Sequence, residues 1–198
     1  MEISLELIKE LREKTGAGIA DCKKSLAEAK GNLDQAVAFI REKGLATAAK
    51  KSSRTASQGL VEAYIHLNGK LGVMVEINCE TDFVAKTNEF RALAHDIALH
   101  ITGANPQFLN REAVPADIVE KEKEILMSQA KNEGLTGDQL SKIVEERIKK
   151  FFSEICLMDQ PFIRDPGKTV ADLIGDTVAK IGENVVVKRF VRFQLGDK

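Results

Sequence analysis

The chain has 198 residues and a formal net charge of −1, and 43% of its residues are hydrophobic and 30% charged. These values are ordinary for a globular protein and leave room for one large domain or a few small ones. They argue against a dedicated nucleic-acid binder, because such proteins carry a strong basic excess. With no Trp and one Tyr, the chain also lacks the aromatic side chains on which bases stack.

The sequence also lacks the signals of several other classes of protein. Cys22, Cys79 and Cys156 have no C-x-x-C spacing, so neither a zinc site nor a disulfide framework is indicated. His95 and His100 are five residues apart, so we expect two partly exposed histidines on different sides of a helix and no metal pair. No apolar run approaches the ~18 residues that would span a membrane, and no signal-peptide core or phosphate-binding glycine motif occurs. We therefore expect a cytoplasmic protein without cofactor, membrane contact or enzymic activity.

Residues 1–54 are predicted to form a three-helix docking module. Ser4 is a good N-cap for the first helix and Asn32 for the third, which we expect to end at Gly44. Three short helices bury little surface alone, so the module suits docking better than catalysis. Residues 45–58, LATAAKKSSRTASQ, contain almost no large apolar residue and are predicted to be a linker.

A small sheet is predicted to follow. Residues 60–79 alternate apolar and polar side chains on both sides of Asn68-Gly69, the strongest short signal of a β-hairpin. Apolar residues at helical spacing over 90–101 predict a helix after the hairpin. Residues 184–195, NVVVKRFVRFQL, are rich in β-branched and aromatic residues and predict a third strand beside it.

This third strand is apolar on both of its faces. Strict alternation divides its apolar side chains into two sets, Val185, Val187, Val191 and Phe193 on one face and Val186 and Phe190 on the other. Helices on one side of the sheet would leave a second apolar face made of Phe190, Met74 and Tyr64. Burial of that face against another copy of the chain would explain its character, so a homodimer through the sheet is expected.

The remaining pattern is that of two long helices. Amphipathic spacing in residues 116–157 predicts an antiparallel helical hairpin with a Gly-containing turn, NEGLTGD. The predicted fold class is α+β: an N-terminal three-helix module, then a core with a small three-stranded antiparallel sheet flanked by helices and a projecting antiparallel helical hairpin. The predicted domains are the docking module (1–54), the first part of the core (55–115), the helical hairpin or coiled coil (116–157) and the end of the core with the last strand (158–198).

One residue does not fit its predicted position. Phe83 lies in NCETDFVAKTNEF (78–90), where a strand has ended and a helix has not clearly begun, and such junctions are usually polar. From the residues alone, the first interpretation is structural. Thr81 would cap a helix and Asp82 would suit its positive end. Phe83 and Val84 would then pack the first turn onto the core.

Four long blocks of the chain resemble the elongation factor Ts family, in consistent order from residue 7 to about residue 195. The blocks are LIKELREKTGAGIADCKKSLAEAKGNLDQAV, VEINCETDFVAKTNEF, DQPFIRDPGKTV and KIGENVVVKRFVRF. The length resembles the short form of the family, in which one core unit replaces two tandem ones.

The resemblance implies a guanine nucleotide exchange factor for elongation factor Tu, the GTPase that delivers aminoacyl-tRNA to the ribosome. In the family, a ubiquitin-associated-like N-terminal module and the core hold the GTPase. An Asp-Phe pair disturbs its Mg²⁺ site, so that GDP leaves and GTP can bind. The residues of this chain that match the pair and its neighbours are Thr81, Asp82, Phe83 and Val84. Those that match the contacting block of the N-terminal module are Arg12, Gly16, Ala17, Gly18 and Ile19.

The chain departs from the family pattern at two places. Ile19-Ala20 stands where methionines are common, and Ile19 is still the apolar residue that the contact needs. Short forms of the family act as dimers, some cross-linked by a C-terminal cysteine that this chain lacks, with Val191 near its place. The resemblance therefore implies a noncovalent homodimer, with no direct nucleic-acid contact.

Two other functions stay open on the residues alone. One is a helical adaptor that docks through residues 1–54 and the hairpin without any effect on nucleotide. The other is nucleic-acid binding through a few basic residues, Lys50, Lys51, Arg54, Lys188 and Arg189. Exchange activity would separate the first from an exchange factor, and a steep salt-dependent affinity for RNA would support the second.

Overall fold

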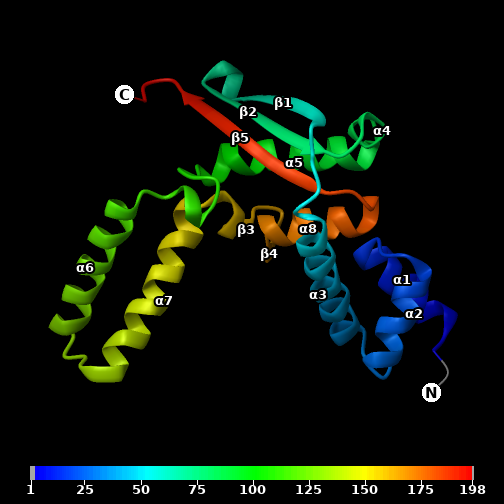
Figure 1. Cartoon of the computed structure of the whole chain (residues 1–198), viewed down its shortest axis with the longest axis horizontal. Coiled ribbons are helices and arrows are strands. Elements are labelled where there is room, and N and C mark those ends of the chain that lie inside the picture. Colours follow the sequence, from blue (N-terminus) through cyan, green and yellow to red (C-terminus); the bar gives the residue numbers. More distant parts are fainter. Residues whose placement is uncertain (1–2, 198) are drawn as a thin grey trace. The chain divides into compact units, whose positions relative to one another are not determined.

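The computed structural model describes residues 3–197 and divides into two compact units, which are described separately. The first unit is the chain up to Ala98 together with the chain from Ala171 onward, and the second is Leu99–Val170. The first holds a three-stranded antiparallel sheet of order β1-β2-β5, and a two-stranded ladder pairs β3 with β4 (Figure 1). The predicted α+β class is confirmed.

The first unit contains the three N-terminal helices and the sheet. Its helices are α1 (Leu5–Thr15), α2 (Ile19–Glu28), α3 (Leu33–Lys51), α4 (Asp82–Ala85), the first part of α5 (Asn88–Ala104) and nearly all of α8 (Val170–Ile181). Its strands are β1 (Gln58–His66), β2 (Leu71–Cys79) and β5 (Val185–Gln194). The short 3-10 turn between β1 and β2 contains Asn68 at φ 56°, the left-handed conformation that Asn tolerates in a hairpin turn.

The N-terminal helices begin where the sequence predicts. The Ser4 hydroxyl accepts the backbone N–H of Leu7 at 3.2 Å, and the Asn32 side chain accepts that of Gln35 at 3.0 Å. Gly16 ends α1 at φ 68°, which a residue with a Cβ adopts only at a cost. The three helices enclose a small apolar core of their own, formed by Ile8, Leu11, Cys22, Leu26, Ala29 and Ala36.

The predicted end of α3 at Gly44 is wrong, because the helix continues to Lys51 and takes in much of the expected linker. Gly44 is buried, and a Cβ there would lie 3.5 Å from the carbonyl oxygen of Gly175 in α8. A Cβ at Gly175 would in turn lie 3.2 Å from the side chain of Leu45. The glycine therefore permits a close approach of two helices and does not stop one.

The two faces of the sheet also differ from the prediction. The pairing of β2 with β5 shifts between Glu76 and Ile77, so Lys188 is an extra residue in β5. One extra residue reverses the face of every side chain that follows it. Val185 and Val187 are therefore buried on the covered face, while beyond the bulge Val191 and Phe193 are exposed on the other. Phe190, opposite Val75, and Tyr64, opposite Val73, lie on the covered face and not on the second face as predicted.

The covered face supplies most of the core of the first unit. Alternate residues of β2 are buried, and helices α5 and α8 lie beneath the sheet (Figure 1). Phe90 and Ile97 of α5 are fully buried, as is Val178 of α8. The opposite face carries six exposed large apolar side chains and is called the open face below: Val61, Ile65, Met74, Val186, Val191 and Phe193.

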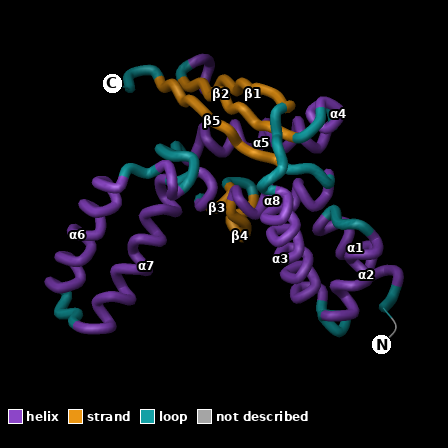
Figure 2. The backbone as a smooth tube through the Cα atoms, viewed as in Figure 1, coloured by secondary structure: helices purple, strands orange, loops and turns teal. Residues whose placement is uncertain are grey.

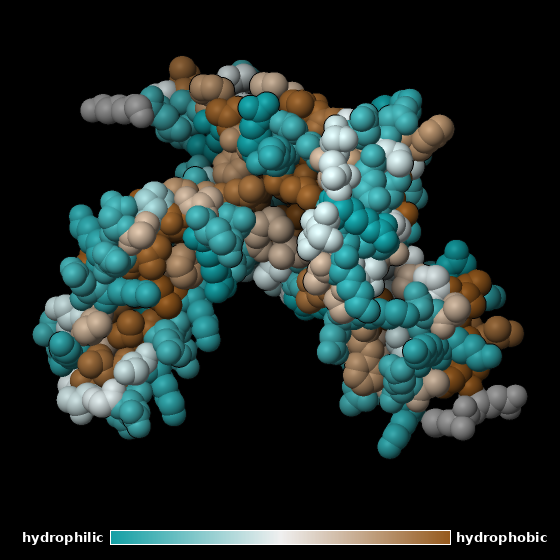
Figure 3. Space-filling model, viewed as in Figure 1, coloured by the Kyte–Doolittle hydropathy of each residue, from teal (hydrophilic) through white to brown (hydrophobic). Residues whose placement is uncertain are grey.

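The second unit contains the predicted pair of antiparallel helices, α6 (Ala116–Asn132) and α7 (Gly137–Ile155). Figure 3 shows apolar side chains along the seam between these helices and polar ones on the outside. The short strands β3 (Pro161–Phe162) and β4 (Asp165–Thr169) form the two-stranded ladder seen in Figure 2.

The prediction for His100 is wrong, because its side chain is fully buried in the second unit. His100 Nε2 lies 2.9 Å from the Gln160 side-chain oxygen, and Nδ1 accepts the backbone N–H of Ile163 at 3.2 Å. Burial lowers the pKa of this imidazole, which favours the neutral form. His95 keeps about half of its side chain exposed and pairs with Glu62.

Candidate protein-docking site

A short turn after β2, residues Thr81–Val84, carries the most exposed aromatic side chain of the described residues and is called the tip below. Thr81 has extended backbone angles, and its side chain accepts the backbone N–H of Val84 at 3.4 Å, as a helix N-cap does. Phe83 is 80% exposed, so the interpretation that it packs onto the core is wrong. Ala85, two residues later, is the buried anchor of this turn.

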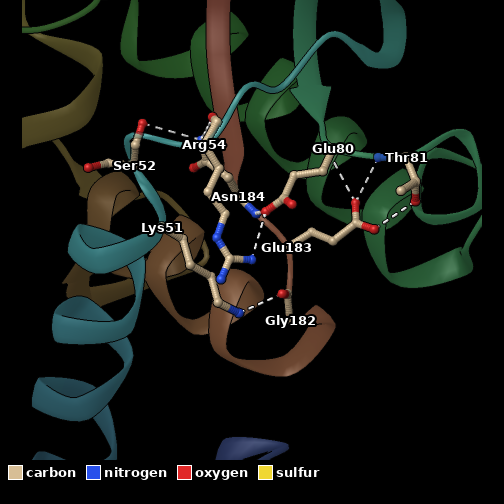
Figure 4. A network of polar contacts seen from close by, with 8 residues as sticks. All are labelled: Lys51, Ser52, Arg54, Glu80, Thr81, Gly182, Glu183 and Asn184. Atoms are coloured by element: carbon tan, nitrogen blue, oxygen red, sulfur yellow. Dashed lines mark hydrogen bonds and ion pairs between the residues drawn. The ribbon is translucent and has the colours of Figure 1, made fainter.

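The tip is fastened to the segment that precedes β5 (Figure 4). The Glu183 carboxylate accepts three hydrogen bonds, from the backbone N–H of Glu80 at 3.1 Å, the backbone N–H of Thr81 at 3.0 Å and the Thr81 hydroxyl at 2.7 Å. Bonds of this kind to an ionised acceptor are about twice as strong as neutral ones. The turn is therefore held by a segment that lies outside both β2 and α4.

A second carboxylate, that of Glu80 directly after β2, binds back to the segment that precedes β5. Glu80 accepts the backbone N–H of Asn184 at 2.7 Å and lies 3.4 Å from the guanidinium of Arg54. The Asn184 side chain donates to the carbonyl of Arg54 at 2.9 Å, and Lys51 donates to the carbonyl of Gly182 at 2.5 Å. Figure 4 shows these side chains converging from the end of α3, the end of β2 and the turn before β5.

Asp82 has its own partner just after the tip. Its carboxylate lies 2.7 Å from Lys86, one helical turn later, and the hydrogen bond from Lys86 holds the pKa of Asp82 below its ordinary value. Both side chains are more than half exposed. Asp82 therefore stays charged near neutral pH and can exchange Lys86 for a group on another molecule.

The predicted contact residues of the N-terminal module lie around the turn between α1 and α2, called the N-terminal turn below. Arg12, Gly16 and Gly18 are exposed, Ala17 is half-buried, and Ile19 is 58% exposed at the start of α2. This turn borders a small hollow whose other walls come from α3 and α8, including Lys43 and Lys180. The tip and the N-terminal turn thus belong to one compact unit but to different elements of it.

The supporting residues Glu183 and Asn184 were missed by reasoning from the sequence. They stand 102 and 104 residues from their partners at 81 and 80, and nothing in the residue types connects them. A signal was present, however, in the predicted pairing of the last strand with the hairpin. Because Cys79 pairs with Val185, the residues just beyond this last pair had to meet.

An exposed aromatic side chain on a fastened turn is typical of a protein-docking site, so fold and site make this a candidate interaction protein of the α+β class. Comparison with known proteins specifies the family. The model of the family described as elongation factor TS matches residues 4–197. The chain therefore belongs to the elongation factor Ts family.

Individual relatives agree with this assignment. The chain is 58% identical to elongation factor Ts of Desulforamulus reducens, over 99% of this chain and 90% of the relative. It is 55% identical to the proteins of the same name from Carboxydothermus hydrogenoformans, over 98% and 90% of the two chains, and from Caldanaerobacter subterraneus, over 98% of each. Within residues 3–197, no helix has the length and apolar character needed to cross a membrane.

Proposed function

We propose that this chain is a guanine nucleotide exchange factor for elongation factor Tu, which binds the GDP-bound GTPase and promotes release of GDP. The observation that carries the proposal is Phe83, an exposed apolar side chain on a turn whose backbone is fastened by Glu183. Membership of the elongation factor Ts family supports it. No bond of this chain changes in such a process, so its action is differential binding and not enzymic catalysis.

The proposed mechanism acts on the Mg²⁺ of the GTPase. GDP and Mg²⁺ are held by charge-assisted bonds to the phosphates, and Mg²⁺ demands near-ideal octahedral geometry. A displacement of the groups that hold the ion therefore weakens binding steeply. Phe83 would enter the GTPase as an apolar wedge, and Asp82 would compete for groups around the metal, with Thr81 and Val84 at the border of the contact.

The size of one buried side chain sets a limit on what Phe83 can do alone. Burial of a Phe side chain is worth roughly 1.5–3 kcal/mol, and this corresponds to about one to two decades in an equilibrium constant. Any larger loss of nucleotide affinity must come from further contacts between the two proteins. We assign them to the N-terminal turn, where Ile19 would be the apolar contact and Arg12 a polar one.

The predicted division into domains at residues 54, 115 and 157 is kept as part of this proposal, and the protein is proposed to act in the cytoplasm.

We further propose that the open face forms a noncovalent homodimer. The face is apolar and regular, and two shallow hollows separate its side chains, one beside Val61 and Val191 and one beside Ile65 and Phe193. Such hollows can receive the side chains of a second copy.

The experiment is release of fluorescent GDP from purified elongation factor Tu, followed by stopped flow with increasing amounts of this protein. We expect a marked acceleration at millimolar Mg²⁺. In EDTA the acceleration should be smaller, because the part that acts through the metal is lost. No acceleration by the folded chain would leave the adaptor function in place of exchange, and equal acceleration with and without Mg²⁺ would contradict the metal mechanism.

A further inference from the structure

The tip cannot hold its own conformation. Helix α4 has four residues, far fewer than the roughly 12 that an isolated helix needs to be even marginally stable in water. Phe83 is exposed and adds no packing of its own. The direction in which Phe83 extends is therefore decided by whatever fixes the backbone of residues 80–84.

Glu183 fixes that backbone in two ways, by bonds to backbone N–H groups and by a bond to the Thr81 side chain. Its carboxylate accepts the N–H groups of Glu80 and Thr81, so it sets the position of the chain as it leaves β2. It also accepts the Thr81 hydroxyl at 2.7 Å. A hydroxyl has one proton, and a carboxylate can only accept, so this proton is directed to Glu183. The lone pairs of the same oxygen are then left for the N–H of Val84, and this bond is the N-cap of α4.

We propose that Glu183 is a positioning residue for Phe83, which acts through Thr81 to keep the aromatic side chain extended toward the partner. The kinetic part of this inference rests on the proposed exchange function, and the structural part does not. Asn184 has a different task in the same network. Its side chain donates to the carbonyls of Ser52 and Arg54, and so it holds the segment between α3 and β1 instead of the tip.

The structural test is hydrogen exchange at individual amides, in the wild type and in Glu183→Ala. The informative amide is that of Val84, because it donates to Thr81 and does not touch Glu183. We expect it to exchange about tenfold faster in the variant, as after loss of roughly one charge-assisted hydrogen bond. The amide of Val75 in the middle of β2 should be unchanged. Unchanged protection of Val84, or an equal loss at Val75, would overturn the inference.

The kinetic test is a cycle of Glu183→Ala, Phe83→Ala and the double variant in the GDP-release assay. If Glu183 acts through Phe83, Glu183→Ala lowers the acceleration by about tenfold in the presence of Phe83 and by less than about twofold in its absence. The matched variant Asn184→Ala should change the rate by the same factor in both backgrounds. Equal factors for Glu183→Ala in both backgrounds would overturn the positioning role.

Two further variants keep the test decisive. Glu62→Ala removes the carboxylate in β1 that pairs with His95 of α5, away from the tip, and should leave release unchanged. If Glu183→Ala does not fold, Glu183→Gln replaces it, because one amide oxygen still accepts N–H groups while the amide nitrogen cannot accept the Thr81 hydroxyl. A smaller effect of the same sign is then expected, and none would overturn the inference. If even the wild type fails to accelerate release, the exchange function fails, and the exchange rate at Val84 still decides the role of Glu183.

Discussion

The tip and the open face both expose apolar side chains, but they are built in different ways. The tip presents one aromatic side chain on a four-residue helix, and charged groups from a distant segment fasten it. The open face presents six large apolar side chains on three paired strands. The difference favours two kinds of contact. A single exposed aromatic side chain suits a pocket, whereas a broad apolar face suits a surface of equal extent.

The largest expected effect is on the free energy of unfolding, and it distinguishes a buried aromatic residue from an exposed one. Phe90, seven residues after Phe83, is fully buried, and Phe90→Ala should lower the free energy of unfolding by about 3–5 kcal/mol. Phe83→Ala should change it by less than about 0.5 kcal/mol, because most of this side chain is exposed to solvent. Urea unfolding followed by circular dichroism measures both. A clear loss of stability in Phe83→Ala would mean that the Phe83 side chain packs against the core of this chain.

The next effect concerns the open face. Val191→Asp places a charge in the centre of the proposed dimer interface, opposite Met74. An unpaired buried charge costs about 3–5 kcal/mol, so the dimer dissociation constant should rise by a hundredfold or more, at roughly 1.4 kcal/mol per decade. Sedimentation equilibrium of the wild type and the variant measures it. The control is Leu5→Asp, at an exposed position on α1. A wild type that is monomeric at micromolar concentration would contradict the dimer.

The smallest effect is electrostatic and belongs to the tip. The pKa of Asp82 is lowered by Lys86, so the charged pair favours the folded tip at neutral pH. This contribution is complete above the ordinary carboxyl value of 3.8 and is lost as the pH falls below it through the lowered pKa. Lys86→Met should return the pKa of Asp82 to its ordinary range. An NMR titration of the Asp82 carboxyl measures this change, and an unchanged titration would mean that Lys86 is not its partner in solution.

The order of the N-terminal helices, the three strands of the sheet and the α6–α7 pair could be predicted from the sequence, because each signal was local, whereas the short β3–β4 ladder was not predicted. Ser4 and Asn32 cap helices, Asn68 turns the hairpin, and the spacing of apolar residues marks α6 and α7. Gly44 failed as a helix stop, because a glycine that permits a helix crossing has the same appearance in sequence as a glycine that ends a helix. Only the position of α8 distinguishes the two.

The errors in the sheet and the site have a different cause. The bulge at Lys188 has no signal in the sequence, because the strand is apolar on both of its faces. Strict alternation was therefore assumed beyond Lys188, and the residues after it were assigned to the wrong faces of the sheet. The backbone of the tip is fastened by Glu183, which lies 102 residues beyond Thr81 in the chain. Residue types could identify the tip by resemblance, but only the strand pairing explains how the tip is fastened.

The central claim is that the fastened tip acts through Phe83. The most direct test is the rate of GDP release from elongation factor Tu with wild type and with Phe83→Ala, at concentrations that saturate binding of each. We expect the variant to keep its fold and to lose about one to two decades of the acceleration, the value of one buried phenylalanine. Acceleration equal to that of the wild type would contradict the claim and transfer the exchange activity to the N-terminal turn.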